Sequence, residues 1–228
     1  MSAVYIISAP SGSGKSTLVN EVRKLIPNLD FSISYTTRKP RGNERNGCEY
    51  FFISVEQFEE MIRRDEFLEH AKVFGNYYGT AKRFLDEARN RGHDLLLDID
   101  VQGAAQIKRK IPRAISIFIL PPDKKTLESR LRKRSLDAEE VIQRRLLNAA
   151  KEIENYQNYD YILVNDCLEQ SIDELRAILL SDRLRRSGGE LSNGDKQVLA
   201  KAERCLLPNV RDRLQPILAS FAVSATSR

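Results

Sequence analysis

The chain has 228 residues, of which 41% are hydrophobic and 30% are charged, and its formal net charge is +5. This balance is typical of a folded domain and is too apolar for a disordered chain. No apolar run approaches the ~18 residues of a membrane span, and no basic leader of a secretory signal precedes the first apolar stretch. Three widely spaced cysteines argue against a disulfide framework or a zinc site. We therefore expect a reduced, intracellular protein of the cytoplasm, with no membrane partner.

Most of the excess positive charge lies in two segments. Residues 181–228 hold nine basic and five acidic residues, a net of +4, which leaves +1 for the first 180 residues. Within those, residues 124–151 hold nine basic and four acidic residues. A basic segment in an otherwise balanced domain suits a small anionic ligand better than a long nucleic acid. The alternative is a solvated helix face, which charge runs commonly form.

Strands and helices alternate along most of the chain. A buried strand is expected over residues 3–9, then a tight loop, then a helix from Lys15 to Leu25 that ends before Pro27. Further buried strands are expected at residues 95–100, 114–120 and 161–164, and helices at 81–91, 103–110 and 168–180. This alternation predicts an α/β fold of three layers, in which helices cover both faces of a parallel sheet.

Two segments interrupt this alternation, and a tail follows it. Residues 32–80 indicate a small mixed or antiparallel sheet with a helix at 55–64, and residues 124–151 are helical and charged. After a linker, the tail predicts helices at 197–206 and 211–221, broken at Pro208 and Pro216. The apolar tail residues, expected to pack on the core or on a sister subunit, are Leu199, Leu206, Leu214, Leu218 and Phe221.

The first loop carries a phosphate-binding motif. Its residues are Ala9, Pro10, Ser11, Gly12, Ser13, Gly14, Lys15 and Ser16. They fit the P-loop spacing G-x-x-x-x-G-K-[ST], except that Ala9 replaces the first glycine. The two glycines allow backbone N–H groups to point inward around an anion, and the helix N-terminus adds positive potential. Lys15 can bridge terminal phosphates and Ser16 can ligate Mg²⁺. A glycine-rich turn without a ligand is the alternative.

A P-loop alone does not distinguish a GTPase, an ATPase and a nucleotide kinase. The chain lacks the Asn-Lys-x-Asp stretch with which a GTPase reads guanine. The basic segment 124–151 instead indicates a lid, whose arginines close over a transferring phosphoryl group and exclude water. Arg130 and Arg134 are four residues apart and share one helix face, and Arg144 and Arg145 follow.

Several further motifs occur in a fixed order after the P-loop. They are S-x-T-T-R-x-P-R from Ser34, G-x-x-Y-x-F from Gly47, F-x-E from Phe67, G-x-Y-Y-G-T from Gly75, D-x-D-x-Q-G-A from Asp98, L-x-x-R-L-x-x-R from Leu127 and V-N-D from Val164. With these motifs the chain resembles the guanylate kinases, from its first residues through Arg186. The resemblance does not extend to the tail.

The resemblance implies a fold and a reaction. The fold is α/β, with a P-loop three-layer parallel-sheet core (residues 1–32, 82–123 and 152–186), a small mixed-β GMP-binding insertion (33–81) and a helical lid (124–151). A helical C-terminal extension (187–228) follows. The reaction is transfer of the γ-phosphoryl group of ATP to GMP or dGMP, with Mg²⁺ as the cofactor.

The resemblance also assigns roles to residues, by position in the matching motifs. ATP would be bound by Ala9, Pro10, Ser11, Gly12, Ser13, Gly14, Lys15, Ser16, Thr17, Arg130, Arg134 and Asn165. GMP would be bound by Ser34, Arg38, Arg41, Tyr50, Glu69, Tyr78, Thr80, Asp98, Asp100 and Arg145. The catalytic residues would be Lys15, Arg38, Arg134 and Arg145, and the residue holding the metal would be Ser16.

The chemistry of these residues agrees with the roles, but interpretations without a role in nucleotide binding remain. Guanidiniums and phenols offer the donors that a phosphate monoester needs, and a carboxylate such as Glu69 pairs with the N–H donors of guanine. Tyr50 and Tyr78 are alternatively half-buried aromatics of a sheet, and Glu69 a surface partner of His70. The chain as a whole is alternatively a non-catalytic interaction module of the same fold. Nucleic acid is not expected as a partner of the tail, whose only aromatic residue is Phe221.

Overall fold

The structure is a computed structural model that describes residues 2–73, 75–134 and 138–222, without the side chain of Arg134. Part of the expected lid (135–137) and the end of the tail (223–228) lie outside the described residues. The chain divides into two compact units. Unit 1 comprises Met1–Ile7 and Asn28–Ser116, and unit 2 comprises Ser8–Pro27 and Ile117–Arg228.

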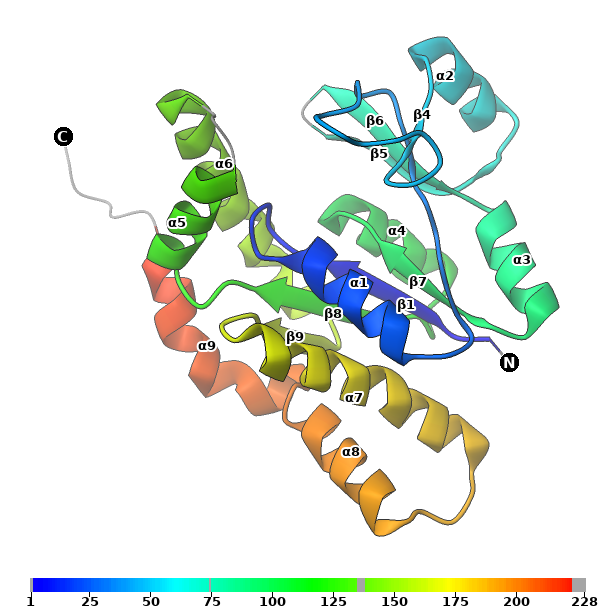
Figure 1. The fold of residues 1–228 in the computed structure, drawn as a ribbon, viewed down its shortest axis with the longest axis vertical. Helices are drawn as coiled ribbons and strands as arrows, with labels where there is room; N and C mark the ends of the chain where they lie inside the picture. Colours follow the sequence, from blue (N-terminus) through cyan, green and yellow to red (C-terminus); the bar gives the residue numbers. More distant parts are fainter. Residues whose placement is uncertain (1, 74, 135–137, 223–228) are drawn as a thin grey trace. The chain divides into compact units, whose positions relative to one another are not determined.

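Figure 1 labels the helices and strands along the chain. The strands are β1 (Val4–Ser8), β2 (Leu29–Phe31), β3 (Tyr35–Thr36), β4 (Phe51–Phe52), β5 (Phe67–Val73), β6 (Asn76–Ala81), β7 (Asp94–Asp98), β8 (Ile115–Leu120) and β9 (Tyr161–Val164). The helices are α1 (Lys15–Leu25), α2 (Val55–Arg63), α3 (Arg83–Arg91), α4 (Val101–Lys110), α5 (Lys124–Arg134), α6 (Glu139–Ile153), α7 (Leu168–Ser187), α8 (Asn193–Glu203) and α9 (Leu207–Phe221), with a 3₁₀ turn η1 (Glu154–Asn158). Within the described residues, none of these helices is both long and apolar enough to cross a membrane.

The predicted α/β class is confirmed. A five-stranded sheet has the order β2-β7-β1-β8-β9, and the pairs β2–β7, β1–β7 and β8–β9 are parallel. Every residue of β1 is buried, as the apolar run predicted. The sequence analysis missed β2, which has three half-buried residues and so presents neither a buried run nor an alternating pattern.

Unit 1 contains the predicted small mixed sheet. Its order is β4-β3-β6-β5, with β3 and β4 parallel and the pairs β3–β6 and β5–β6 antiparallel. Ser54 precedes helix α2 and forms a reciprocal cap, in which Ser54 and Gln57 each bond the other's backbone N–H. Phe58 of this helix is fully buried and stacks on Phe67 and Tyr77 at centroid distances of 4.4 and 5.1 Å. These aromatic contacts pack α2 against β5 and β6.

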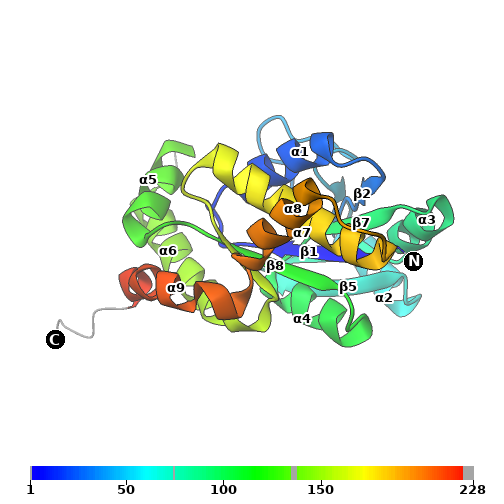
Figure 2. The ribbon, with the colours of Figure 1, turned by 90° about the horizontal axis from the view of Figure 1, so that it is seen from below.

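In unit 2 the tail packs on other elements of the same unit. Helix α8 lies along α7, and α9 contacts both β9 and α5 (Figure 1, Figure 2). Of the five apolar tail residues, Leu214 and Phe221 are buried, whereas Leu199, Leu206 and Leu218 are half-buried. Two arrangements of the tail were expected from the sequence, packing on the core or on a sister subunit. The structure contains the first of them.

Two details of the tail differ from the sequence-based expectation. Helix α8 begins at Asn193, four residues early, because Ser192 and Asp195 form a reciprocal cap within the expected linker. The break expected at Pro216 is wrong: α9 continues through it to Phe221. A proline inside a helix costs one backbone hydrogen bond, and burial of Leu214, Ile217 and Phe221 offsets that loss. Pro208 lies in the first turn of α9, where its missing N–H costs nothing.

Candidate active site

The phosphate loop, residues 9–16, connects β1 to α1 in the way the P-loop motif requires. Gly12 and Gly14 have φ angles of +93° and +86°, which only glycine adopts without strain. Gly14 is the residue before α1, and no side chain caps the helix there. Lys15 is the first residue of α1 and Ser16 is exposed beside it. The N–H groups at the start of α1 are thus arranged as an anion site needs them.

Two neighbours hold this loop from outside. A Cβ at Gly12 would lie 2.9 Å from Leu131 Cδ2 and 3.0 Å from Leu127 Cδ1, so α5 lies directly against the loop. A Cβ at Gly14 would collide with Asn165 Nδ2. That amide donates a hydrogen bond to the carbonyl of Ser13 at 2.7 Å, and Asn165 is only 5% exposed. Asn165 was expected from the sequence to bind ATP, but its contact with the loop was not expected.

The arginines of the expected lid occupy different environments on α5 and α6. Arg130 is half-buried, and its Nη1 has no hydrogen-bond partner among the described residues. Arg145 on α6 is also half-buried. Arg134 is the last residue of α5, and its side chain is outside the described part of the chain. A buried guanidinium nitrogen without a partner is costly, which is compatible with an anionic ligand at Arg130.

Arg132, which was not among the residues selected from the sequence, joins α5 to α6. It bonds Glu128 within α5 at 2.7 Å and Glu139 at the start of α6 at 2.6 Å. Hydrogen bonds from Arg132 lower the pKa of Glu139 to about 2. The spacing of four residues to Glu128 was a visible signal of a helical ion pair, but the contact to α6 required the structure.

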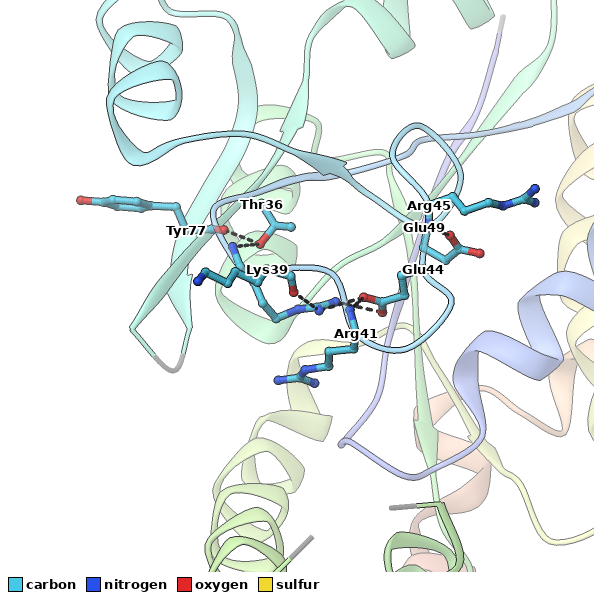
Figure 3. A network of polar contacts seen from close by, with 8 residues as sticks. Thr36, Lys39, Arg41, Glu44, Arg45, Glu49 and Tyr77 are labelled. Atoms are coloured by element: carbon cyan, nitrogen blue, oxygen red, sulfur yellow. Dashed lines mark hydrogen bonds and ion pairs between the residues drawn. The ribbon is translucent and has the colours of Figure 1, made fainter. Parts of the chain in front are cut away.

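In unit 1, Arg38 is the most enclosed of the predicted phosphate ligands, at 9% exposure. It donates to both carboxylate oxygens of Glu44, at 2.8 and 3.0 Å, and to the carbonyl of Lys39 at 2.7 Å. Figure 3 shows Glu44 and Lys39 in this network. The guanidinium carbon of Arg38 also lies 5.2 Å from the centre of the Tyr50 ring. Sequence analysis missed Glu44, which stands six residues from Arg38 across a turn.

The other predicted phosphate ligands are close to Arg38. The rings of Tyr50 and Tyr78 meet edge to face at 5.9 Å, and the Tyr78 phenol hydrogen-bonds Arg38. Arg41 is exposed, and its backbone N–H donates to Glu44 Oε2 at 2.7 Å (Figure 3). Burial raises the pKa of Glu44, but hydrogen bonds from Arg38 and the Arg41 backbone outweigh it and lower the pKa below its usual value. Arg38 and the two phenols thus form a group of donors suited to an anion, and Arg41 is linked to this group through its backbone.

Glu69 on β5 is a buried carboxyl group, only 3% exposed. Burial raises its pKa to about 7, and the negative charge of Asp100 adds to the shift. The closeness of Thr80, its partner across the ladder, and the positive charge of Lys110 oppose this rise in pKa. The alternative of a surface ion pair with His70 is therefore wrong. A buried carboxyl group of this kind favours a ligand that offers N–H donors.

Helix α4 shapes the space around Glu69. Asp100 caps this helix by accepting the backbone N–H groups of Gln102 and Gly103, each at 2.8 Å. A Cβ at Gly103 would collide with Glu69 Oε2, which explains the glycine in the D-x-D-x-Q-G-A motif. The structure thus brings Glu69, Thr80 and Asp100 together.

The two remaining predicted residues of unit 1 lie at strand ends. Asp98 is half-exposed at the carboxyl end of β7, where ligands of parallel sheets bind. Ser34 is nearly buried just before β3, and its carbonyl accepts the N–H of Phe51 at 2.9 Å. Both roles stay predictions.

Comparisons with known proteins give one consistent result. The family profile described as Guanylate kinase matches residues 1–182. A guanylate kinase of Koribacter versatilis (strain Ellin345) is 59% identical over 221 residues, which cover 96% of this chain and 95% of the relative. A guanylate kinase of Escherichia coli (strain K12) is 50% identical over 186 residues, covering 81% and 90%. Among solved structures, the crystal structure of guanylate kinase from Anaplasma phagocytophilum has a TM-score of 0.66 and 32% identity, covering 79% of this chain and 86% of that one.

Proposed function

Because the chain belongs to the guanylate kinase family, we propose that it transfers the γ-phosphoryl group of ATP to GMP, giving ADP and GDP. We extend the proposal to dGMP as an acceptor and to the cytoplasm as the location. The observation that carries the choice of acceptor is the buried carboxyl group of Glu69. Its enclosure beside Asp100 and Thr80 leaves a carboxylate that a ligand with two adjacent N–H donors would satisfy.

Guanine offers such donors at N1 and N2, whereas adenine presents an acceptor at N1. We assign the reading of guanine to Glu69 and Asp100, assisted by Ser34 and Thr80. An adenine base would leave the buried carboxylate of Glu69 without these donors, which costs more than the missing contact itself. Selectivity against AMP therefore follows mainly from Glu69.

The phosphate of GMP is assigned to Arg38, Arg41, Tyr50 and Tyr78. Support comes from the closeness of Arg38, Tyr50 and Tyr78. The carboxylate of Glu44 also binds Arg38 through both of its oxygens, in the bidentate geometry that a phosphate adopts with arginine. On binding, the phosphate would share or replace Glu44 at that guanidinium. Asp98 and Arg145 are assigned to the end of GMP that receives the phosphoryl group.

ATP is assigned to the phosphate loop, whose backbone N–H groups would surround the β-phosphate. Lys15 would contact the terminal phosphates, with Thr17 and Arg130 beside them, and Asn165 would lie near the adenine. Ser16 is exposed on the first turn of α1 and offers one hydroxyl oxygen to Mg²⁺. This donor set fits, since Mg²⁺ is commonly held by one or two protein oxygens together with substrate phosphates and water. When bound, the ion would neutralise charge on the phosphates of ATP.

The chain's residues would act by positioning and by neutralising charge. The phosphate of GMP is itself the nucleophile, so no general base is required. Lys15, Arg38, Arg134 and Arg145 are the assigned catalytic residues, which would stabilise the charge that spreads over the transferred phosphoryl group.

The proposal is tested by ADP formation in a coupled assay with GMP, dGMP, AMP, UMP or TMP as the acceptor. We expect turnover with GMP and dGMP, and at least about 100-fold lower kcat/KM with the other three. Turnover that is independent of GMP, or equal with AMP, contradicts the proposal.

Lys15→Met separates catalysis from GMP binding. Loss of the cation at the terminal phosphates should reduce turnover at least about 1000-fold, while GMP binding measured by calorimetry persists. Lys24→Met is the matched control, because Lys24 lies on the same helix but is exposed and paired with Glu21 at 2.7 Å. Unchanged turnover in Lys15→Met would remove the phosphate loop from the mechanism.

A further inference from the structure

The start of helix α9 is fixed to the edge strand of unit 2. The N–H of Ile162 in β9 donates to the carbonyl of Cys205 at 2.8 Å, and the N–H of Leu207 donates to the carbonyl of Asp160 at 3.1 Å. These two bonds join the tail to β9 on either side of Tyr161. The direction in which α9 leaves the sheet is therefore set by backbone hydrogen bonds.

The other end of α9 meets the beginning of α5 (Figure 2). The Ser220 hydroxyl donates to the carbonyl of Ile217 at 2.6 Å and accepts the backbone N–H of Lys124 at 3.1 Å. Lys124 is the first residue of α5, and its N–H has no partner within that helix. Asp123 accepts the N–H of Thr126 at 2.6 Å. Helix α5 thus begins with one cap from its own sequence and one from the tail.

Helix α5 in turn lies against the phosphate loop. Leu127 and Leu131 are 0% and 1% exposed, and both approach Gly12 so closely that a Cβ there would displace them. Arg130 stands between these two leucines in the sequence of the helix. A displacement of α5 at its first turn would therefore change both the packing on the loop and the position of Arg130.

We propose that Ser220 is a positioning residue of the ATP site, which holds the first turn of α5 so that this helix supports the phosphate loop and presents Arg130. The proposal rests on the assignment of that loop to ATP. Ser220, Lys124, Leu127 and Gly12 all belong to unit 2. Glu69 and the cluster around Arg38, which are assigned to GMP, belong to unit 1. A substitution of Ser220 should therefore change the KM for ATP and not the KM for GMP.

The test compares three single substitutions. Ser220→Ala removes the cap from α5, and Ser220→Thr keeps a hydroxyl. Ser192→Ala is the matched control, because it removes a serine cap from α8 in the same tail, where Ser192 accepts the N–H of Asp195 at 3.1 Å. KM for ATP, KM for GMP and kcat are measured at a temperature well below the unfolding transition of every variant.

We expect Ser220→Ala to raise KM for ATP by about two- to fivefold, the change that one net hydrogen bond supports, and to leave KM for GMP unchanged. Ser220→Thr should restore the wild-type value, and Ser192→Ala should leave both KM values unchanged. An unchanged KM for ATP in Ser220→Ala, an equal rise in both KM values, or the same rise in Ser192→Ala would overturn the proposal.

Amide hydrogen exchange gives a second readout that needs no activity. Exchange in a peptide covering the first turn of α5 should be faster in Ser220→Ala than in the wild type, whereas peptides of α8 should be unchanged. Unchanged exchange at α5 would also overturn the proposal. If the wild type shows no GMP-dependent ADP formation, the proposed function fails, and exchange still decides whether Ser220 holds α5.

Discussion

The phosphate loop of unit 2 and the Arg38–Glu69 region of unit 1 are both suited to nucleotides, but they differ in how the site is built. In the loop, the groups that face an anion are backbone N–H groups, and their direction depends on the left-handed conformation of Gly12 and Gly14. In unit 1, the corresponding groups are charged side chains held by other charged side chains, such as Arg38 by Glu44.

This difference predicts how each region responds to change. A site made of backbone depends on space and conformation, so adding one methyl group damages it, whereas pH and salt have little effect. A site made of paired charges depends on protonation, so it responds to pH and to removal of one charge. The substitutions below address each region in turn.

Gly14→Ala should have the largest effect. The new methyl group meets Asn165 Nδ2, and an alanine at this φ costs roughly 1–2 kcal/mol of strain. Because the loop must shift to relieve both, we expect turnover to fall at least about 100-fold, with GMP affinity unchanged. Steady-state kinetics and GMP calorimetry measure the two quantities.

Gly188→Ala is the control for this substitution. Gly188 lies in the same unit at a φ of +65°, but nothing stands within 4 Å of its Cβ position. The Gly188→Ala variant should be destabilised by a similar strain energy, measured by thermal unfolding, but its turnover should be unchanged. If both variants lose turnover equally, general destabilisation explains the result and the contrast between the two regions is lost.

Glu69→Gln should have the next largest effect, and on the other substrate. The amide accepts at one atom only and carries no charge, so kcat/KM for GMP should fall about 10- to 100-fold while KM for ATP is unchanged. Glu66→Gln, an exposed carboxyl group just before β5, is the control and should behave as wild type. A larger change in KM for ATP than for GMP contradicts the assignment.

The raised pKa of Glu69 predicts two pH dependences of opposite sign. Its pKa of about 7 in the folded protein lies above the ordinary 4.5, so the buried group costs stability as the pH rises from about 4.5 through 7, by about 3 kcal/mol at most. The ionised form is the one that accepts from guanine, so kcat/KM for GMP should rise over the same interval, about tenfold per pH unit below 7.

Both dependences are measured against Glu69→Gln. The phosphate of GMP itself titrates near pH 6, and this contribution cancels in the ratio of the two proteins. Melting temperature and kcat/KM are recorded from pH 5 to pH 8.5. Parallel profiles for the two proteins would show that Glu69 is not the titrating group.

Arg132→Ala should have the smallest effect. Its ion pairs to Glu128 and Glu139 lie at the surface, where solvent screens them, so we expect a slight fall in melting temperature that disappears in ~1 M salt. Arg109→Ala, on an exposed position of α4, controls for loss of a surface charge. A large fall in melting temperature that persists in high salt would contradict the view that Arg132 contributes only surface ion pairs.

Local patterns predicted much of the fold. The limits of α1 were predicted to the residue, because a regular apolar spacing lies between a glycine loop and Pro27. The buried strands were predicted with limits within two residues of those observed, since their side chains are apolar on both faces. By contrast, β2 exists only because β7 offers it a ladder, and the continuity of α9 through Pro216 depends on buried neighbours. Such tertiary contacts leave no periodic signal.

The same division holds within the candidate site. The glycines and Lys15 of the loop were found from spacing alone, because their role is local. Glu69 was selected only through the family resemblance, and its burial depends on Gly103, which is 34 residues away. Glu44 and the loop contact of Asn165 were missed, since both depend on where a distant or turning segment returns.

The two backbone hydrogen bonds at the start of α9 pair Leu206 with Tyr161 as a single antiparallel β-bridge, and this pairing has a consequence for solubility. Strand β9 is the last in the order of the five-stranded sheet, and an outermost strand exposes backbone groups that can template pairing with a second molecule. Residues 205–207 occupy part of that row in an antiparallel manner. A chain shortened before residue 205 would leave these backbone groups of β9 exposed, and we expect such a chain to aggregate more readily than the full chain.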